Sequence, residues 1–333
     1  MKIVLIAPGF KPLPPQGWGA VESIVWDYYT VLSKKFELEN TRGNKNQVVI
    51  VNRTNPIEIV REANSHPDAD VVHIMYDDYI VVVPYLTCPL IFYTSHYAYL
   101  THPRFESQYS YYFRNIFMRV IEHSQKIFLM VISQDIFEKY ADHGFPPQRM
   151  SVLQNGARED VFQYKPIAPF HPGKSIYLAK IEERKAQYLY QSISSIDFVG
   201  NYAGSAFDTR SPQYLGEWDK PKLYQSMTEY ANLVLLSDGE ADPLVVKEAL
   251  MAGLGLVISS CCTANLDLSK PFISVVPNGK LGDVEYVKGV IEQNRKVSLA
   301  MRDEIRAYAL REFSWDRITD KYLFWIEYYS RLV

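Results

Sequence analysis

Nearly continuous runs of Val, Ile and Leu alternate with longer amphipathic runs along the chain, and this alternation constrains the fold most. In the first half, runs typical of strands occupy residues 2–8, 47–53, 69–76, 89–96, 126–133 and 149–156. Runs typical of helices occupy residues 21–36 and 56–66. Aliphatic strands between helices are characteristic of a parallel sheet that is covered on both faces. The pattern therefore predicts an α/β fold.

A proline-rich segment, residues 163–173, interrupts the alternation and shows no periodicity. The pattern then restarts, with strand-like runs at 175–181, 196–203, 232–237, 255–260 and 272–277 and helical runs at 185–195, 243–253 and about 284–313. A chain of 333 residues is long enough for two domains, at roughly 100–200 residues each. We expect domains over 1–165 and 166–314, with ligands bound in a cleft at the carboxyl ends of the strands.

Composition narrows the classes of function. Lys and Arg total 35 against 38 Asp and Glu, so no basic excess favours nucleic-acid binding. The three cysteines, Cys88, Cys261 and Cys262, have no metal-site spacing and suggest reduced thiols. The first apolar run is too short for a signal peptide, and no apolar run reaches about 18 residues. We expect a cytoplasmic protein.

A small-residue loop, PPQGWGAVE at 14–22, joins the first strand to the first helix. Gly17 and Gly19 would let backbone N–H groups approach a ligand, and the helix that follows adds a positive dipole. A plain turn remains an equal alternative. Because the loop is not GxGxxG, an NAD-dependent enzyme is disfavoured.

Charged residues follow two strands of the second domain. Lys180 and Lys185 flank a strand end and could pair with a diphosphate, although a solvated turn explains them as well. Glu240 and Glu248 bracket the start of a helix. Asp242 is expected to be its N-cap and Pro243 its first residue, with Gly253 at its end. Glutamates at this spacing are also common without function.

Two histidines lie in strand-like runs of the first domain. His96 ends such a run, where ligands bind in α/β sheets, although a structural histidine would fit equally well. His73 lies inside a run and is expected in the core. The C-terminal aromatic residues are expected to serve mostly in packing; they are Tyr322, Phe324, Trp325, Tyr328 and Tyr329.

These motifs occur in an order that resembles the retaining glycosyltransferases of family 4. The segments that carry the resemblance are PPQGWGAVE (14–22), SVLQNGAREDVF (151–162), YLAKIEERKA (177–186), EADPLVVKEALMAGLGLVIS (240–259) and REFSWDRITDKYL (311–323). The resemblance implies the GT-B fold: two Rossmann-like, doubly wound parallel-sheet domains facing a central cleft. It also implies that a C-terminal helix at about 315–333 crosses back to the first domain.

The resemblance implies transfer of a sugar from a UDP- or GDP-sugar to an acceptor hydroxyl with retention of configuration, without a metal or cofactor. Pro243 replaces the family's glycine and has no N–H, so the helix contact to phosphate would shift to Leu244 and Val245. The implied roles are catalytic for Glu240, His96 and Lys185, diphosphate-binding for Gly17, Gly19, Lys180, Lys185, Leu244 and Val245, and ribose-binding for Glu248.

The acceptor would be a glycan, a lipid-linked molecule or a small molecule, and peripheral contact with a membrane is compatible with the sequence. Candidate acceptor residues follow His96, because aromatic rings stack on sugars and arginine binds anions; they are Tyr97, Tyr99, Arg104 and Tyr109. A core helix with tyrosines on its rim is the alternative. Two other functions remain open: a GT-B nucleotide-sugar epimerase, and a non-catalytic nucleotide-sugar binding protein. The sequence carries no signal for oligomeric state.

Overall fold

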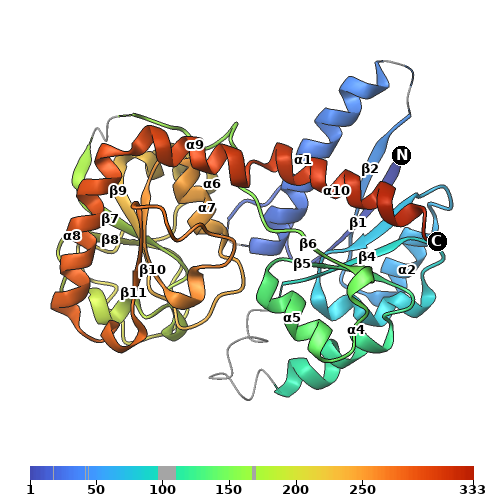
Figure 1. Cartoon of the computed structure of the whole chain (residues 1–333), viewed down its shortest axis with the longest axis horizontal. Helices are drawn as coiled ribbons and strands as arrows, with labels where there is room; N and C mark the ends of the chain where they lie inside the picture. Colours follow the sequence, from blue (N-terminus) through green and yellow to red (C-terminus); the bar gives the residue numbers. More distant parts are fainter. Residues whose placement is uncertain (18, 42, 44, 97–109, 167–169) are drawn as a thin grey trace. The chain divides into compact units, whose positions relative to one another are not determined.

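The computed structural model describes residues 1–333 except 18, 42, 44, 97–109 and 167–169 (Figure 1). The chain forms two compact units, Met1–Asn155 with Trp315–Val333, and Gly156–Ser314. The first boundary lies before the position 165 expected from the sequence, because the intervening segment bonds to the second unit. Its Ala157 N donates to Phe313 O at 2.8 Å. The final helix belongs to the first unit.

The first unit is built on a six-stranded sheet of order β2-β1-β3-β4-β5-β6, in which every pair is parallel. Every residue of β3, β4 and β5 is buried, as expected for central strands of a parallel sheet that is covered on both faces. The strands are β1 (Lys2–Ala7), β2 (Gln47–Asn52), β3 (Val71–Ile74), β4 (Ile91–Ser95), β5 (Phe128–Val131) and β6 (Met150–Val152).

Helices cover this sheet; they are α1 (Ala20–Asn40), α2 (Pro56–Asn64), α4 (Met118–Glu122), α5 (Gln134–Asp142) and α10 (Trp315–Ser330). Two of these helices, α1 and α10, enclose an aromatic core. Tyr28 of α1 packs edge-on against Tyr322 of α10, with ring centroids 5.0 Å apart. His73 lies beside them, and its ring hydrogen-bonds Tyr322 Oη at 3.1 Å and Thr94 Oγ1 at 2.6 Å. The predicted core position of His73 is confirmed.

The aromatic residues of α10 divide between two faces. Tyr322 and Tyr329 are buried, as expected for packing, whereas Phe324 is 56% exposed and Tyr328 is 44% exposed. The division follows helical periodicity, because residues three or four apart share a face. The expectation that these residues serve mostly in packing is therefore wrong for the outer face.

The second unit has a five-stranded parallel sheet of order β11-β10-β9-β7-β8. The predicted α/β class with two parallel sheets is confirmed. Its strands and helices are β7 (His171–Leu178), β8 (Ile196–Val199), α6 (Lys220–Ser226), β9 (Tyr230–Leu235), α7 (Leu244–Met251), β10 (Gly255–Ser259), β11 (Ile273–Val276), α8 (Val284–Ala300) and α9 (Arg302–Phe313).

The prediction of a helix over residues 185–195 is wrong. Two short 3-10 turns, Glu183–Lys185 and Gln187–Tyr190, occupy this region, and Ala186 between them is left-handed with φ 55°. A side chain hydrogen-bonds to the backbone here, since Gln187 Nε2 donates to Lys180 O at 2.9 Å. Gln187 is fully buried. Tertiary hydrogen bonds thus override the helical pattern.

The stretch predicted to be helical, about 284–313, forms two helices, α8 and α9, which meet at Met301. The next residue, Arg302, is buried, and its guanidinium donates to the carbonyls of Lys165 at 2.8 Å and Tyr230 at 3.0 Å. The break at Met301 therefore coincides with a buried arginine that bonds to backbone carbonyls outside both helices.

In both sheets the strand order changes direction beside the first strand. β2 and β3 lie on opposite sides of β1, and β8 and β9 lie on opposite sides of β7. Parallel sheets bind ligands at the carboxyl ends of strands beside such a switch point. A ligand-binding site is therefore expected at the loops after β1, β7 and β9. Within the described part of the chain, no helix combines the length and apolarity needed to cross a membrane.

Candidate functional site

Tyr177, near the end of β7, joins the loops that follow β7 and β9. Its hydroxyl donates to Lys185 O at 2.5 Å and accepts a hydrogen bond from Leu236 N at 2.8 Å. The loops also meet directly, since Asp238 N donates to Arg184 O at 2.8 Å. Burial raises the pKa of Tyr177 well above its ordinary value, so the hydroxyl keeps its proton. The two loops therefore form one fixed unit at the switch point of the second sheet.

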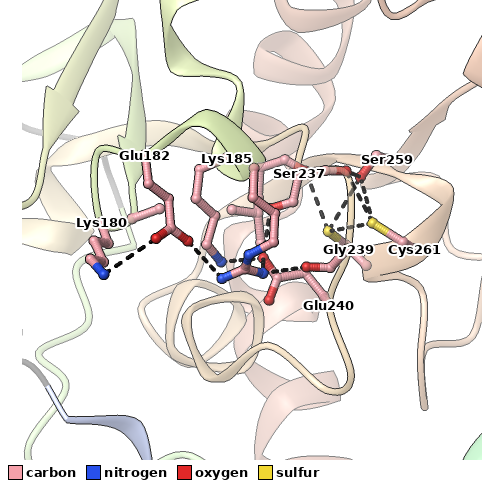
Figure 2. Close-up of polar contacts among 12 residues, drawn as sticks. Lys180, Glu182, Lys185, Ser237, Gly239, Glu240, Ser259 and Cys261 are labelled. Carbon is pink, nitrogen blue, oxygen red and sulfur yellow. Dashed lines mark hydrogen bonds and ion pairs between the residues drawn. The ribbon is translucent and has the colours of Figure 1, made fainter. Parts of the chain in front are cut away.

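A buried ion pair lies where these loops meet, as Figure 2 shows. Lys185 Nζ bonds to Glu240 Oε1, and the two side chains are only 12% and 10% exposed. Arg184 Nη1 lies 3.6 Å from the same carboxylate oxygen. Ser237 Oγ also donates to Glu240 Oε1, at 2.6 Å. The structure thus brings together two residues that the sequence placed in one catalytic group.

The charge state of Glu240 follows from these contacts. Burial alone would raise the pKa of this carboxyl, but the charges of Lys185 and Arg184, with the hydrogen bonds from Lys185 and Ser237, outweigh it. The net pKa lies below the ordinary value for glutamate. Glu240 is therefore a carboxylate at neutral pH.

Lys180 is linked to this pair through Glu182. Lys180 Nζ lies 3.3 Å from Glu182 Oε2, and Arg184 Nη2 donates to Glu182 Oε1 at 2.8 Å (Figure 2). Lys180 is 47% exposed, so its ammonium group is accessible to a ligand. Three cationic side chains, those of Lys180, Arg184 and Lys185, therefore follow β7. The carboxylates of Glu182 and Glu240 lie between them.

Helix α7 begins differently from the prediction. Pro243, and not Asp242, is its N-cap, so the predicted N-cap is wrong. Asp242 is instead buried, and it forms an ion pair with Lys247 while accepting a hydrogen bond from Asn265 Nδ2 at 3.0 Å. The first-turn N–H groups of α7, which include those of Leu244 and Val245, have no acceptor within the helix. The partial positive charge of the helix end remains available to an anion.

Helix α7 ends as the sequence predicts. Gly253 has φ +81°, and its N–H donates to Leu250 O at 3.0 Å while Leu254 N donates to Ala249 O at 2.9 Å. This pair of hydrogen bonds is the Schellman motif, which favours glycine because it requires a left-handed residue. The same helix carries Glu248, whose Oε1 lies 4.0 Å from Lys220 Nζ. Burial raises the pKa of Glu248, with Lys220 acting against it.

In the first unit, Gly17 and Gly19 lie on the loop after β1, at the switch point of that sheet. Gly19 precedes α1 with φ 156°, and a Cβ placed on it would lie 2.6 Å from Glu22 Oε2. The backbone conformation therefore favours glycine at position 19, and a side chain there would also displace the Glu22 carboxylate. Glu22 is itself buried at the start of the helix.

His96 follows β4 and lies against a buried carboxylate that we did not predict. Its backbone N–H donates to Asp77 Oδ2 at 3.1 Å, and Tyr112 Oη donates to Asp77 Oδ1 at 2.5 Å. The Nε2 atom of His96 is buried and has no hydrogen-bond partner among the described residues. Burial lowers the pKa of His96 to about 4 and raises that of Asp77 to about 6. The imidazole is therefore neutral at neutral pH.

The raised pKa of Asp77 gives a test of this cluster. The folded state holds the proton up to about pH 6, whereas the unfolded chain releases it near its ordinary pKa of 3.8. The contribution of Asp77 to stability is therefore greatest at low pH and falls as pH rises towards 6. Raising the pH from 4.5 to 7 should change the unfolding free energy of Asp77→Asn relative to wild type by about 2 kcal/mol, in favour of the variant. Urea unfolding at both pH values measures this change.

The control is Asp78→Asn, which removes the exposed carboxyl that follows in the sequence. A difference between Asp77→Asn and wild type that stays constant across this pH range would contradict the assignment.

Four predicted acceptor residues, Tyr97, Tyr99, Arg104 and Tyr109, lie outside the described residues.

Three other residues of the candidate sites were not predicted from the sequence. Tyr177, Ser237 and Asp77 hold the loops through hydrogen bonds. Only Asp77 had a sequence signal, as an acidic residue directly after a strand-like run.

No protein-family model matches the sequence, and neither does any curated protein. Solved structures do match. HepE from Anabaena in complex with UDP and glucose has a TM-score of 0.70 at 13% identity, over 98% of this chain and 99% of that one. Sucrose-phosphate synthase from Thermosynechococcus elongatus has a TM-score of 0.72 at 12% identity, over 100% and 99%. The glycosyltransferase AviGT4 of avilamycin A biosynthesis has 0.66 at 16%, over 99% and 98%. The fold is GT-B.

Proposed function

We propose that this chain is a retaining glycosyltransferase that moves a sugar from a nucleotide diphosphate sugar to an acceptor hydroxyl without a metal ion. The observation that carries the proposal is the buried Lys185–Glu240 pair at the switch point of the second sheet. The resemblance to family 4 assigns both residues to catalysis. HepE, which has the same fold, has been solved with UDP-glucose. The fold and the paired residues together support a nucleotide-sugar site in the second unit.

The second unit has groups suited to a departing diphosphate. Lys180, Arg184 and Lys185 supply positive charge at the end of β7. The N–H groups of Leu244 and Val245 add the positive end of a helix. Fixed charges of this kind stabilise negative charge as it develops on a leaving group. In this proposal they take the part that a divalent metal plays in other transferases.

Glu240 and Glu248 are proposed to bind the two sugars of the donor. Glu240 is ionised and fixed by Ser237, so it can accept hydrogen bonds from the transferred sugar and favour positive charge at its anomeric carbon. Glu248, on α7, would accept hydrogen bonds from the ribose hydroxyls. The departing phosphate takes the acceptor proton, which requires no separate base. The first unit would hold the acceptor, with neutral His96 as a hydrogen-bond partner.

Binding identifies the donor. A panel of UDP, GDP and their sugars, tested by thermal shift and then calorimetry, should contain one nucleotide that raises the stability of the chain. A ligand at 100 times its Kd adds about 2.7 kcal/mol to the unfolding free energy. The best nucleotide names the base, and its sugars then serve as substrates. A panel without any stabilising nucleotide would refute the proposal.

With that donor, Glu240→Gln should lower turnover about 10²-fold while leaving nucleotide affinity close to that of wild type. The amide keeps the size of the side chain but loses the charge at the transferred sugar. Glu248→Ala should weaken nucleotide binding instead. Steady-state kinetics and calorimetry separate the two effects. The control is Glu285→Gln, a side chain that is 86% exposed. Wild-type turnover in Glu240→Gln, or wild-type nucleotide affinity in Glu248→Ala, would refute the role assigned to that residue.

Product analysis distinguishes the remaining alternatives. NMR of the product should show the anomeric configuration of the donor, and turnover should survive excess EDTA. Formation of an epimer without acceptor would identify an epimerase. Donor binding without hydrolysis or transfer would identify a binding protein.

A further inference from the structure

Glu182 lies between two of the cations that follow β7. Its Oε2 is 3.3 Å from Lys180 Nζ, as Figure 2 shows. Its Oε1 accepts a hydrogen bond from Arg184 Nη2 at 2.8 Å. Within the described part of the chain, the Glu182 carboxylate has no other partner, and the Lys180 ammonium group has no partner but Glu182. One carboxylate therefore occupies two of the three cations that are proposed to bind the diphosphate.

The second carboxylate of this cluster, Glu240, is held more firmly. Its side chain is 10% exposed, pairs with Lys185 and accepts a hydrogen bond from Ser237 Oγ at 2.6 Å. The Glu182 side chain is 22% exposed, and no hydroxyl, amide or backbone N–H of the described residues donates to it. Glu182 can therefore turn into solvent by giving up ion pairs alone, and it is the displaceable carboxylate of the two.

The charges of the cluster favour exchange of Glu182 for a diphosphate. Lys180, Arg184 and Lys185 carry three positive charges, and Glu182 and Glu240 cancel two of them. Carboxylate and phosphate oxygens accept the same charge-assisted hydrogen bonds from lysine and arginine. A diphosphate at these cations also meets the Glu182 carboxylate as a like charge, which repels it. Full use of the cations by a diphosphate therefore requires Glu182 to leave them.

We propose that Glu182 competes with the diphosphate for these cations and thereby favours release of the product. Glu182 pairs with Lys180 and Arg184 in the free protein, yields both to a bound diphosphate, and returns to them as the product leaves. The terminal phosphate of a free nucleoside diphosphate ionises a second time at about pH 6, whereas the sugar ester cannot. The product therefore carries more negative charge than the donor at pH 7, and Glu182 opposes it more strongly. This role rests on the proposed function.

The variant Glu182→Gln tests the competition through a gain of affinity, which damage to the fold does not produce. The amide keeps the size of the side chain but loses its charge. Calorimetry at pH 7 and low salt uses UDP, GDP and their glucose esters. The dissociation constant of the nucleoside diphosphate that binds should fall about tenfold, and that of its glucose ester about threefold. Unchanged or weaker binding would overturn the proposal, and equal gains for both ligands would refute the preference for product release.

The matched control is Glu183→Gln. Glu183 is the next residue along the chain, it is exposed, and its carboxylate has no ion pair among the described residues. Both substitutions change the net charge of the protein equally, so an effect of overall charge appears in both variants. We expect the affinity of Glu183→Gln to stay close to that of wild type. Equal gains in the two variants would show that Glu182 does not compete directly.

The exchange can also be observed in a complex. A crystal structure with the nucleoside diphosphate that binds should place Lys180 Nζ and the Arg184 guanidinium about 2.7–3.2 Å from phosphate oxygens. The Glu182 carboxylate should then point into solvent. A complex in which Glu182 keeps both cations would contradict the proposal.

Inorganic pyrophosphate separates this proposal from the proposed function, because it carries two phosphates without a base or a sugar. If neither UDP nor GDP binds, the proposed function fails. Pyrophosphate then decides the role of Glu182, and it should bind Glu182→Gln about tenfold more tightly than wild type. Equal binding to both proteins, or binding to neither, would overturn that role.

Discussion

Replacing Lys185 with alanine should lower donor turnover about 10³-fold and weaken nucleotide diphosphate binding as well. The variant loses a positive charge that faces the leaving group. It also leaves the Glu240 carboxylate with Arg184 as its cationic neighbour at 3.6 Å, so the carboxylate repels the donor phosphates more strongly. Kinetics with the donor selected by the nucleotide panel, and calorimetry with the matching nucleotide diphosphate, measure both effects.

The matched control is Lys174→Ala. Lys174 lies on the same strand, β7, and its Nζ pairs with Asp197 Oδ1 at 2.8 Å, but it is near the amino end of the strand. Loss of this pair should leave turnover unchanged. The double variant Lys185→Ala/Glu240→Gln should lose less than the sum of the two single effects, because the residues act as one unit. Additive losses would show that Lys185 and Glu240 act independently.

The fold could be predicted because its evidence is local. Aliphatic runs mark buried strands wherever they occur, so a strand was found at each predicted run, although the runs at 149–156 and 196–203 form strands of only 3 and 4 residues. The errors arise where distant groups decide. Residues 185–195 have helical periodicity, but burial of Gln187 and the left-handed Ala186 prevent the helix. Likewise, Asp242 has the residue type and position expected of an N-cap, but its carboxylate forms an ion pair with Lys247 of α7 instead.

The site could be predicted only as separate segments. Sequence spacing indicated Lys185 and Glu240, but their contact depends on β7 and β9 being neighbours, which is a property of the strand order. Tyr177 shows the same limit. It looks like any aromatic residue of a strand, and its role appears only when its hydroxyl is seen between two loops. A residue such as Tyr177, which positions others through one hydroxyl group, has no chemical signature in the sequence.

The largest effect on stability is expected at Lys247, whose ion pair with Asp242 is almost completely buried. The side chains of Lys247 and Asp242 are 1% and 0% exposed. Lys247→Met keeps most of the side-chain volume but removes the cation, so the buried Asp242 carboxylate loses its ion pair and keeps the hydrogen bond from Asn265 Nδ2 at 3.0 Å. Removing one partner of a buried pair costs about 3–5 kcal/mol. Urea unfolding should show a loss of this size in the second unit.

Two further variants decide whether the loss comes from the uncompensated charge. Lys247→Met/Asp242→Asn should recover most of the stability, because a neutral amide needs no cation and can still accept the hydrogen bond from Asn265. Lys270→Met removes a surface pair with Asp267, at 3.1 Å and with side chains 33% and 47% exposed, and should cost at most about 1 kcal/mol. If the double variant were as unstable as Lys247→Met, the loss would come from packing of the lysine stem. Recovery would instead show that the loss comes from the uncompensated Asp242 carboxylate, which directly precedes Pro243, the N-cap of α7, where the diphosphate is proposed to bind.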